Sequence, residues 1–274
     1  MRSRLARIVP IYWLMTVAAL LLWAVFPAAV PGTLADLRNI ALSLAFVPHA
    51  VPPGFNSPVL LQGWTLNYEM GFYLTATSCL AVAWRYRRLA LGAYLLGTAL
   101  IAMYLNWFNV LVSPLSIEFA IGAGLALAEP WITTVASRWL WWLLWGAGGA
   151  ILAAEVVFPI PDYGMTTLLH AGVGLLMVLG ALLAENRSPA RLIRGLGAIG
   201  DASYALYLSH LLVIMPLGIA IASWPLGLRL PALAVAAVGI AMLIHRHVEA
   251  PLHRKCDAIL GQCGAILARI WARG

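Results

Sequence analysis

Charged residues are scarce in this sequence. Asp, Glu, Lys and Arg make up only 10% of its 274 residues, whereas hydrophobic residues make up 63%, and the mean hydropathy is +0.90. Soluble domains are about 25% charged and about 45–50% apolar, so the composition excludes an ordinary soluble domain. It predicts an integral membrane protein.

Two patterns are missing as well. The three cysteines, Cys79, Cys256 and Cys263, have neither CxxC nor Cys/His spacing, so they predict no metal site and no redox pair. The apolar stretches run for about 17 to 22 residues and lack the period-2 alternation of transmembrane barrel strands. The sequence therefore predicts an all-α fold, a polytopic transmembrane helical bundle.

Hydropathy predicts about eight membrane-spanning helices and one orientation. If the N-terminus is cytoplasmic, only Arg38 and Arg229 of the 17 Lys and Arg residues fall outside, which leaves 15 inside. The positive-inside rule therefore predicts that both termini are cytoplasmic. The net charge of +7 reflects this topology, not a nucleic-acid partner, because the arginines form short clusters between apolar runs. The predicted spans are 8–26, 65–84, 89–105, 114–128, 139–158, 165–184, 201–222 and 229–245.

The rest of the chain divides into connections and a tail. The longest outside segment, 27–64, is rich in Pro and Gly, and within it residues 36–47 predict a short surface helix. After Pro251, apolar residues recur at helical spacing beside basic ones, which is typical of an interfacial helix. We therefore expect a transmembrane domain over 1–251 and an amphipathic cytoplasmic tail over 252–274.

Few ionisable residues fall at helix depth, where a charge costs roughly 2.5 to 3.5 kcal/mol on insertion scales. They are Glu69, Glu118, Glu155, His170 and His210. Glu118 follows Ser-Pro at a helix start, where the helix dipole favours an acid, so a structural role is at least as good an explanation as chemistry. For Glu155 and His170, which lie toward the outer boundary, packing or snorkelling is favoured.

Glu69 stands out among them. It lies about one turn inside its span, and Tyr73 follows at i+4 on the same helix face. Trp64 and Asn67 precede it at the membrane interface. The structural alternative is a helix start capped by Thr65, but that cap leaves Glu69 unexplained. We therefore interpret Glu69 and Tyr73 as candidate catalytic residues, and Trp64 and Asn67 as candidate substrate-binding residues.

Two other groups of polar residues carry candidate chemistry. Ser203, Tyr207 and His210 share one face of an otherwise apolar helix. They are either helix-helix contacts or a site in which His210 acts in catalysis and Tyr207 contacts substrate. Arg4 and Arg7, one turn apart at the inner face, have planar guanidinium groups that suit phosphate, although topology alone also explains such residues.

Four motifs in order resemble the acyltransferase 3 family: residues 4–13 (RLARIVPIYW), residues 63–69 (GWTLNYE) with Phe72-Tyr73, residues 203–210 (SYALYLSH) and residues 248–252 (VEAPL). The segment Phe46-Val47-Pro48-His49 is similar to the branch that O-acetylates exopolysaccharides. The resemblance implies a multi-pass enzyme of the bacterial inner membrane that moves an acyl group, most often acetyl from acetyl-CoA, to a hydroxyl of a surface glycan or its lipid-linked precursor.

The resemblance implies no permanently bound cofactor and no metal; acetyl-CoA would be the acyl donor. The expected partners are membrane lipid, the donor and the glycan acceptor. Two helices that usually begin the family, with the histidine usually taken as catalytic, are absent before Met1. A late start, a fragment and a degenerate homologue that is inactive as written all stay open, and that histidine's role is not transferred to His210 or His49.

The working hypothesis assigns Arg4 and Arg7 to the donor phosphates, and Glu69, Tyr73 and His210 to a polar cavity where donor and hydroxyl meet. Imidazole, with an unperturbed pKa of about 6.5, suits a base at neutral pH. A transporter or flippase is the alternative, because intramembrane carboxylates and histidines also mark proton relays. A further alternative is an inactive scaffold of a polysaccharide assembly complex.

Overall fold

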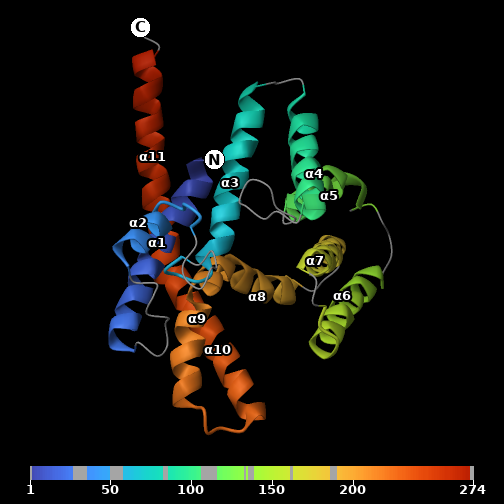
Figure 1. Cartoon of the computed structure of the whole chain (residues 1–274), viewed down its shortest axis with the longest axis vertical. Coiled ribbons are helices and arrows are strands. Elements are labelled where there is room, and N and C mark those ends of the chain that lie inside the picture. Colours follow the sequence, from blue (N-terminus) through green and yellow to red (C-terminus); the bar gives the residue numbers. More distant parts are fainter. Residues whose placement is uncertain are drawn as a thin grey trace. The chain divides into compact units, whose positions relative to one another are not determined.

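The computed structural model describes residues 2–26, 36–49, 58–82, 86–105, 116–132, 134, 139–160, 163–185 and 190–271, and no strand occurs within these ranges. The all-α prediction is confirmed. Each predicted span coincides with one helix: α1 (Arg2–Val25), α3 (Gly63–Val82), α4 (Arg87–Leu105), α5 (Ser116–Ile132), α6 (Leu140–Val157), α7 (Tyr163–Glu185), α9 (Ser203–Ala220) and α10 (Leu226–Ile244) (Figure 1).

Among the described residues, four helical stretches are long and apolar enough to cross a membrane. They are Arg4–Val25, Met165–Ala184, Ser203–Ala220 and Leu226–Gln262. α4 and α6 contain the shorter apolar stretches Leu89–Thr98 and Leu140–Glu155. The orientation of the termini stays a prediction.

Three further helices join the expected spans. α2 (Leu37–Leu44) confirms a helix within 36–47, although its polar residues Asn39 and Ser43 are buried. α8 (Ala190–Asp201) lies where only a basic connection was expected. α11 (Ala250–Trp271) covers the predicted tail and continues from α10 through a π-helical turn, His245–Glu249. The domain division at residue 251 stays a prediction.

The described chain separates into two compact units. The first comprises Met1–Met70 and Arg194–Gly274, and the second comprises Gly71–Ile193. The boundary crosses α3 after Met70, so Glu69 belongs to the first unit and Tyr73 to the second. Each unit is described by itself below.

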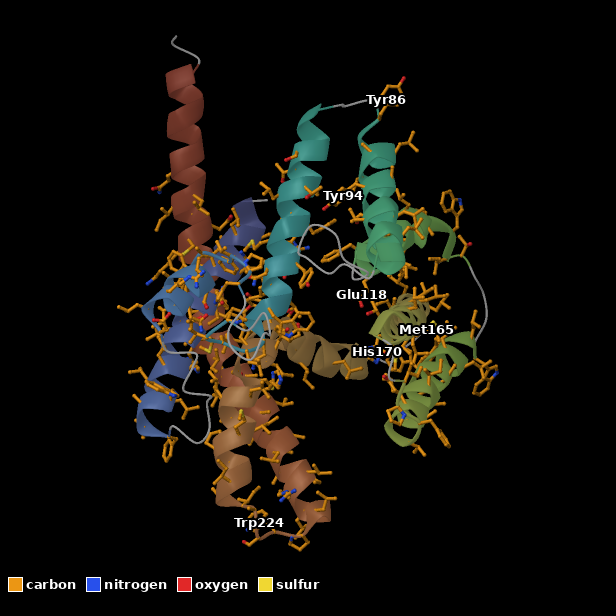
Figure 2. The ribbon with its side chains drawn as sticks, viewed as in Figure 1. Tyr86, Tyr94, Glu118, Met165, His170 and Trp224 are labelled. Carbon is orange, nitrogen blue, oxygen red and sulfur yellow. The ribbon has the colours of Figure 1, made fainter. Side chains whose placement is uncertain are left out.

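In the first unit, α1 packs against α9 and α11, and α9 and α10 form a hairpin. Figure 2 shows Trp224 at the tip of this hairpin. α1 buries Ile8, Tyr12 and Met15, which recur at helical spacing. Its Trp13 and Val17 are each 48% exposed. A helix that is apolar on all faces, with one face packed and the other outward, is typical of a span in contact with lipid.

A close approach between α1 and α3 explains a glycine at the start of the GWTLNYE motif. A Cβ on Gly63 would lie 2.8 Å from both Cε2 and the hydroxyl of Tyr12. Tyr12 is fully buried, and its ring lies 4.7 Å from that of Phe46. Phe46 has a φ of 56°, a left-handed conformation that is uncommon outside glycine. Only glycine fits at position 63 without displacing Tyr12.

In the second unit, α7 packs against α5 and α6, and α4 packs against α5. The α6–α7 contact contains Trp141 and Leu183, and the indole of Trp145 donates a 3.0 Å hydrogen bond to the carbonyl of Met177. A Cβ on Gly180 would lie 2.5 Å from Cδ1 of Trp145. Here too a glycine lets an aromatic ring approach the neighbouring helix.

Candidate active site

The first unit contains a cavity of about 270 Å³, which we call the arginine cavity. α1 contributes two basic side chains, α3 contributes one carboxylate, and α9 contributes hydroxyls. The residues that line it are Arg4, Arg7, Ile8, Glu69, Ser203, Tyr204 and Tyr207. Four of them, Arg4, Arg7, Glu69 and Tyr207, are predicted site residues from three separate parts of the sequence.

The two arginines differ in their contacts. Arg7 donates from Nε to a carboxylate oxygen of Glu249 at 3.2 Å and from Nη2 to the carbonyl of Asp201 at 3.3 Å. Its side chain is 35% exposed. Arg4 is exposed and has no hydrogen-bond or ion-pair partner among the residues that the structure describes. Arg7 is therefore anchored, whereas the guanidinium of Arg4 is available to an anion.

The hydroxyl groups in the cavity are held by backbone and side-chain partners. The hydroxyl of Tyr207 donates to the carbonyl of Gln62 at 3.0 Å and lies 2.5 Å from Oγ1 of Thr65. The hydroxyl of Tyr204 donates to the carbonyl of Ile8 at 3.3 Å. These bonds link α9 to α1 and to the start of α3, which is the segment that carries the GWTLNYE motif.

Glu69 completes the cavity from α3. It is half-buried, and its carboxylate interacts electrostatically with Tyr204 and Tyr207. A carboxylate beside two aromatic hydroxyls and two guanidinium groups can accept a proton from a nearby hydroxyl or orient it. The arrangement suits chemistry on an anionic donor and a hydroxyl-bearing acceptor.

Comparison with known proteins identifies the chain. A family model for the acyltransferase domain matches residues 1–246. The chain belongs to the acyltransferase 3 family. This acyltransferase is also 30% identical over 269 residues to the exopolysaccharide production protein ExoZ of Rhizobium meliloti (strain 1021), with 92% of this chain and 80% of that protein covered. No solved structure matches.

The acyltransferase is a multi-pass membrane protein, given its apolar helices and its family. Its predicted His210 lies one turn beyond Tyr207 and does not line the arginine cavity. Nδ1 of His210 lies 2.8 Å from the carbonyl of Tyr207 and 3.2 Å from that of Leu206. Because both neighbours are acceptors, Nδ1 carries a proton, so Nε2 is the acceptor when the ring is neutral.

The remaining predicted residues lie outside the cavity lining. Asn67 is buried, with 5% exposure. Trp64 is 36% exposed, and its ring packs edge-on against Tyr68 at 5.9 Å. Tyr73 lies in the second unit, with its ring 5.7 Å from that of Phe72. Their assigned roles stay predictions.

Two residues near Arg7 have no role in the sequence analysis: Glu249, which contacts Arg7, and His245, which contacts Glu249. Glu249 is 2% exposed, and its second carboxylate oxygen lies 2.9 Å from Nδ1 of His245. A signal for Glu249 is present in the sequence, because it belongs to the VEAPL motif at 248–252, one of the four that resemble the family. Which arginine it meets depends on the packing of α1 against α11.

The second unit contains a larger cavity of about 670 Å³ between α5 and α7, which we call the acidic cavity. Its polar lining is Glu118, Glu129 and His170, and its other lining residues are aliphatic or glycine. Nε2 of His170 lies 2.7 Å from a carboxylate oxygen of Glu155 on α6. Figure 2 shows Glu118 and His170 on α5 and α7. Within the described residues, no group of three or more His, Cys, Asp or Glu could hold a metal.

Proposed function

We propose that this acyltransferase transfers an acyl group, acetyl from acetyl-CoA, to a hydroxyl of an exopolysaccharide or another cell-surface glycan. The observation that carries the proposal is the arginine cavity, where two guanidinium groups, a carboxylate and two tyrosine hydroxyls converge in a chain of the acyltransferase 3 family. The related protein of Rhizobium meliloti is named for exopolysaccharide production, which supports the acceptor class.

The donor end of the reaction fits the two arginines. Coenzyme A carries phosphate groups, and guanidinium forks bind phosphate through paired hydrogen bonds. Both Arg4 and Arg7 lie near the start of α1, which is predicted to face the cytoplasm, where acetyl-CoA is made. This orientation also supports a location in the bacterial inner membrane.

The acceptor end fits Glu69. In the transfer, the sugar oxygen attacks the thioester carbonyl, the carbon–sulfur bond breaks, and the hydroxyl proton passes through a base to the departing thiolate. The products are a sugar ester and free coenzyme A. Glu69 is the carboxylate among the described residues that line the arginine cavity, so we assign it the proton acceptor's role. Tyr207 orients the acceptor, and His210 supports the helix turn that carries it.

The test uses the purified protein in liposomes, with labelled acetyl-CoA and the exopolysaccharide of its host. We expect alkali-labile label in the polysaccharide, together with release of free coenzyme A. Tyr207→Phe removes the hydroxyl that meets Gln62 and Thr65, and should reduce transfer about fivefold, the equivalent of one modest hydrogen bond. Tyr94→Phe is the matched control, because Tyr94 lies on α4 in the second unit. Transfer that is absent in the wild type contradicts the proposal.

A glycan transporter or flippase is the second candidate, and the acidic cavity favours it. The hydrogen-bonded Glu155 and His170, with Glu118 lining the same cavity as His170, resemble the carboxylate and histidine groups of proton relays. Movement of labelled glycan into liposomes without acetyl-CoA, driven by a proton gradient, would support this function. Acetyl transfer without such movement would support the enzyme.

A further inference from the structure

Glu249 is a buried carboxylate that the proposed chemistry does not use. Its side chain is 2% exposed, and its two oxygens are divided between two partners, Nε of Arg7 at 3.2 Å and Nδ1 of His245 at 2.9 Å. A buried charge is stable only when it is paired and hydrogen-bonded. The three side chains therefore form a continuous chain of contacts that ends at the arginine cavity.

A local backbone feature presents Glu249 to Arg7. Residues His245–Glu249 form a π-helical turn, and the N–H of Ala250 bonds to the carbonyl of His245. Pro251 follows and has no N–H to offer to the preceding turn, which accounts for a wider turn at this place. π-helical turns of this kind inside α-helices are frequent at functional sites.

Arg7 and Glu249 differ in solvent exposure, and the exposed part of Arg7 is available to a ligand. Glu249 is buried, whereas Arg7 is 35% exposed and lines the arginine cavity. Arg7 uses two of its five N–H groups on Glu249 and on the carbonyl of Asp201, which leaves three in the fixed plane of the guanidinium. Arg4 lies one turn away without a partner among the described residues.

We propose that Glu249 is a positioning residue for the acyl donor: supported by His245, it fixes the guanidinium of Arg7 so that its remaining N–H groups face a phosphate of the donor nucleotide. The inference rests on the proposed function and names the part of the donor that the arginine cavity holds. Glu249 acts through Arg7 and does not touch the donor itself.

The test separates donor binding from chemistry. Glu249→Gln, Glu249→Asp, Arg7→Lys and the double variant Glu249→Gln/Arg7→Lys are compared by the KM and kcat for acetyl-CoA. We expect Glu249→Gln to raise KM about tenfold or more, the effect of a lost charge-assisted hydrogen bond, with kcat within about threefold. Arg7→Lys should match it, and the double variant should be no worse than either, because both act through one guanidinium. Asp36→Asn, at an exposed acid of the same unit, is the control.

Two kinetic results would contradict the positioning role of Glu249. A fall in kcat with unchanged KM, or full additivity of the double variant, overturns the inference. If Glu249→Gln fails to fold, Glu249→Asp and His245→Gln carry the test, since the first keeps the charge and the second changes only the supporting partner. Both should raise KM by less than Arg7→Lys does, and an unchanged KM in both overturns the inference.

A binding measurement keeps the inference apart from the proposed function. Adenosine 3′,5′-bisphosphate, which carries the nucleotide phosphates without a thioester, is titrated onto the purified protein. If the wild type transfers no acetyl group, the proposed function fails, and the bisphosphate titration alone tests the positioning role of Glu249. Weaker binding of the bisphosphate by Glu249→Gln than by the wild type supports that role. Equal binding, or no binding by the wild type, overturns it.

Discussion

The two cavities differ in how their polar residues are held. In the arginine cavity, Arg7 meets Glu249, 242 residues away along the chain, and Tyr204 meets Ile8, 196 residues away. At the acidic cavity, His170 contacts Glu155, 15 residues away on the adjacent helix. The first set of side chains is positioned from several separate parts of the sequence, and the second from neighbouring helices.

The two cavities also differ in the sign of the charge on their lining residues. The arginine cavity presents two guanidinium groups with one carboxylate, whereas the acidic cavity presents two carboxylates and an imidazole among apolar walls. Only the first offers the paired donors that a phosphate-bearing molecule requires. The proposed function places the donor in the smaller cavity, because charge and anchored side chains matter more than volume for holding a phosphate.

Neutralising one acid in each cavity gives the largest expected contrast. Glu69→Gln should reduce acetyl transfer by about 100-fold or more, the usual loss when a general base is removed. Glu129→Gln, in the acidic cavity, should leave the rate within about threefold. Labelled acetyl in the polysaccharide measures both. Equal losses in the two variants would remove the distinction between the cavities.

Gly63 and Gly180, the closely packed glycines of the two units, allow the stability of each unit to be compared. Gly63→Ala places a Cβ 2.8 Å from the ring of Tyr12, and overpacking of this kind costs about 1–3 kcal/mol. Thermal unfolding in detergent should detect the loss, and acetyl transfer should fall with it because the start of α3 shifts. Gly180→Ala should destabilise the second unit similarly.

Gly92→Ala is the control for both, since no described atom outside its own stretch of helix lies within 4 Å of the added Cβ. We expect its unfolding temperature to be unchanged or slightly raised, because alanine favours a helix more than glycine does. A stable Gly63→Ala protein with full activity would show that the contact with Tyr12 is not needed.

The exposed arginine tests whether the arginine cavity binds the donor. Arg4→Gln should raise the KM for acetyl-CoA about tenfold, as expected for one charge-assisted hydrogen bond, and leave the unfolding temperature unchanged because Arg4 has no partner among the described residues. Arg254→Gln removes an exposed arginine from α11 and should leave KM unchanged. A rise in KM of equal size in both would indicate a general effect of surface charge.

The smallest effect is expected in the acidic cavity. His170→Gln breaks the contact with Glu155, in which His170 is 46% exposed. An exposed pair contributes about 0–1 kcal/mol, so the unfolding temperature and acetyl transfer should both change little. A large loss of acetyl transfer with intact stability would move the chemistry to the second unit. A loss of glycan movement would instead favour the transporter.

Much of the fold could be predicted because the lipid environment imposes simple rules. Long apolar runs are forced to form helices, since no water satisfies the backbone there, and each predicted span is a helix in the structure. α8 was missed although Leu192, Leu196 and Ile199 recur at helical spacing, because three glycines at 195, 197 and 200 disfavour a helix.

The candidate site was predicted in part. Arg4 and Arg7 are predicted because planar guanidinium groups suit phosphate, Glu69 because a carboxylate at membrane depth requires a reason, and Tyr207 because it shares a helix face with His210. The structure places all four around one cavity. His210 is predicted as an ionisable residue at membrane depth, and Tyr73 by its helical spacing from Glu69, but neither lines that cavity. Spacing along one helix tells which residues share a face, but not how far down that face a cavity extends.

The sequence by itself determined the helical class, the positions of the eight helices that match the predicted spans, and the polar residues that membrane depth makes exceptional, because these depend on local composition and period. Only the tertiary structure decided that Glu249 meets Arg7, that Gly63 makes room for Tyr12, and that α1, α3 and α9 enclose one cavity. Those contacts join residues that are tens to hundreds of positions apart, and their pairing is set by how helices pack against one another, which no local pattern encodes.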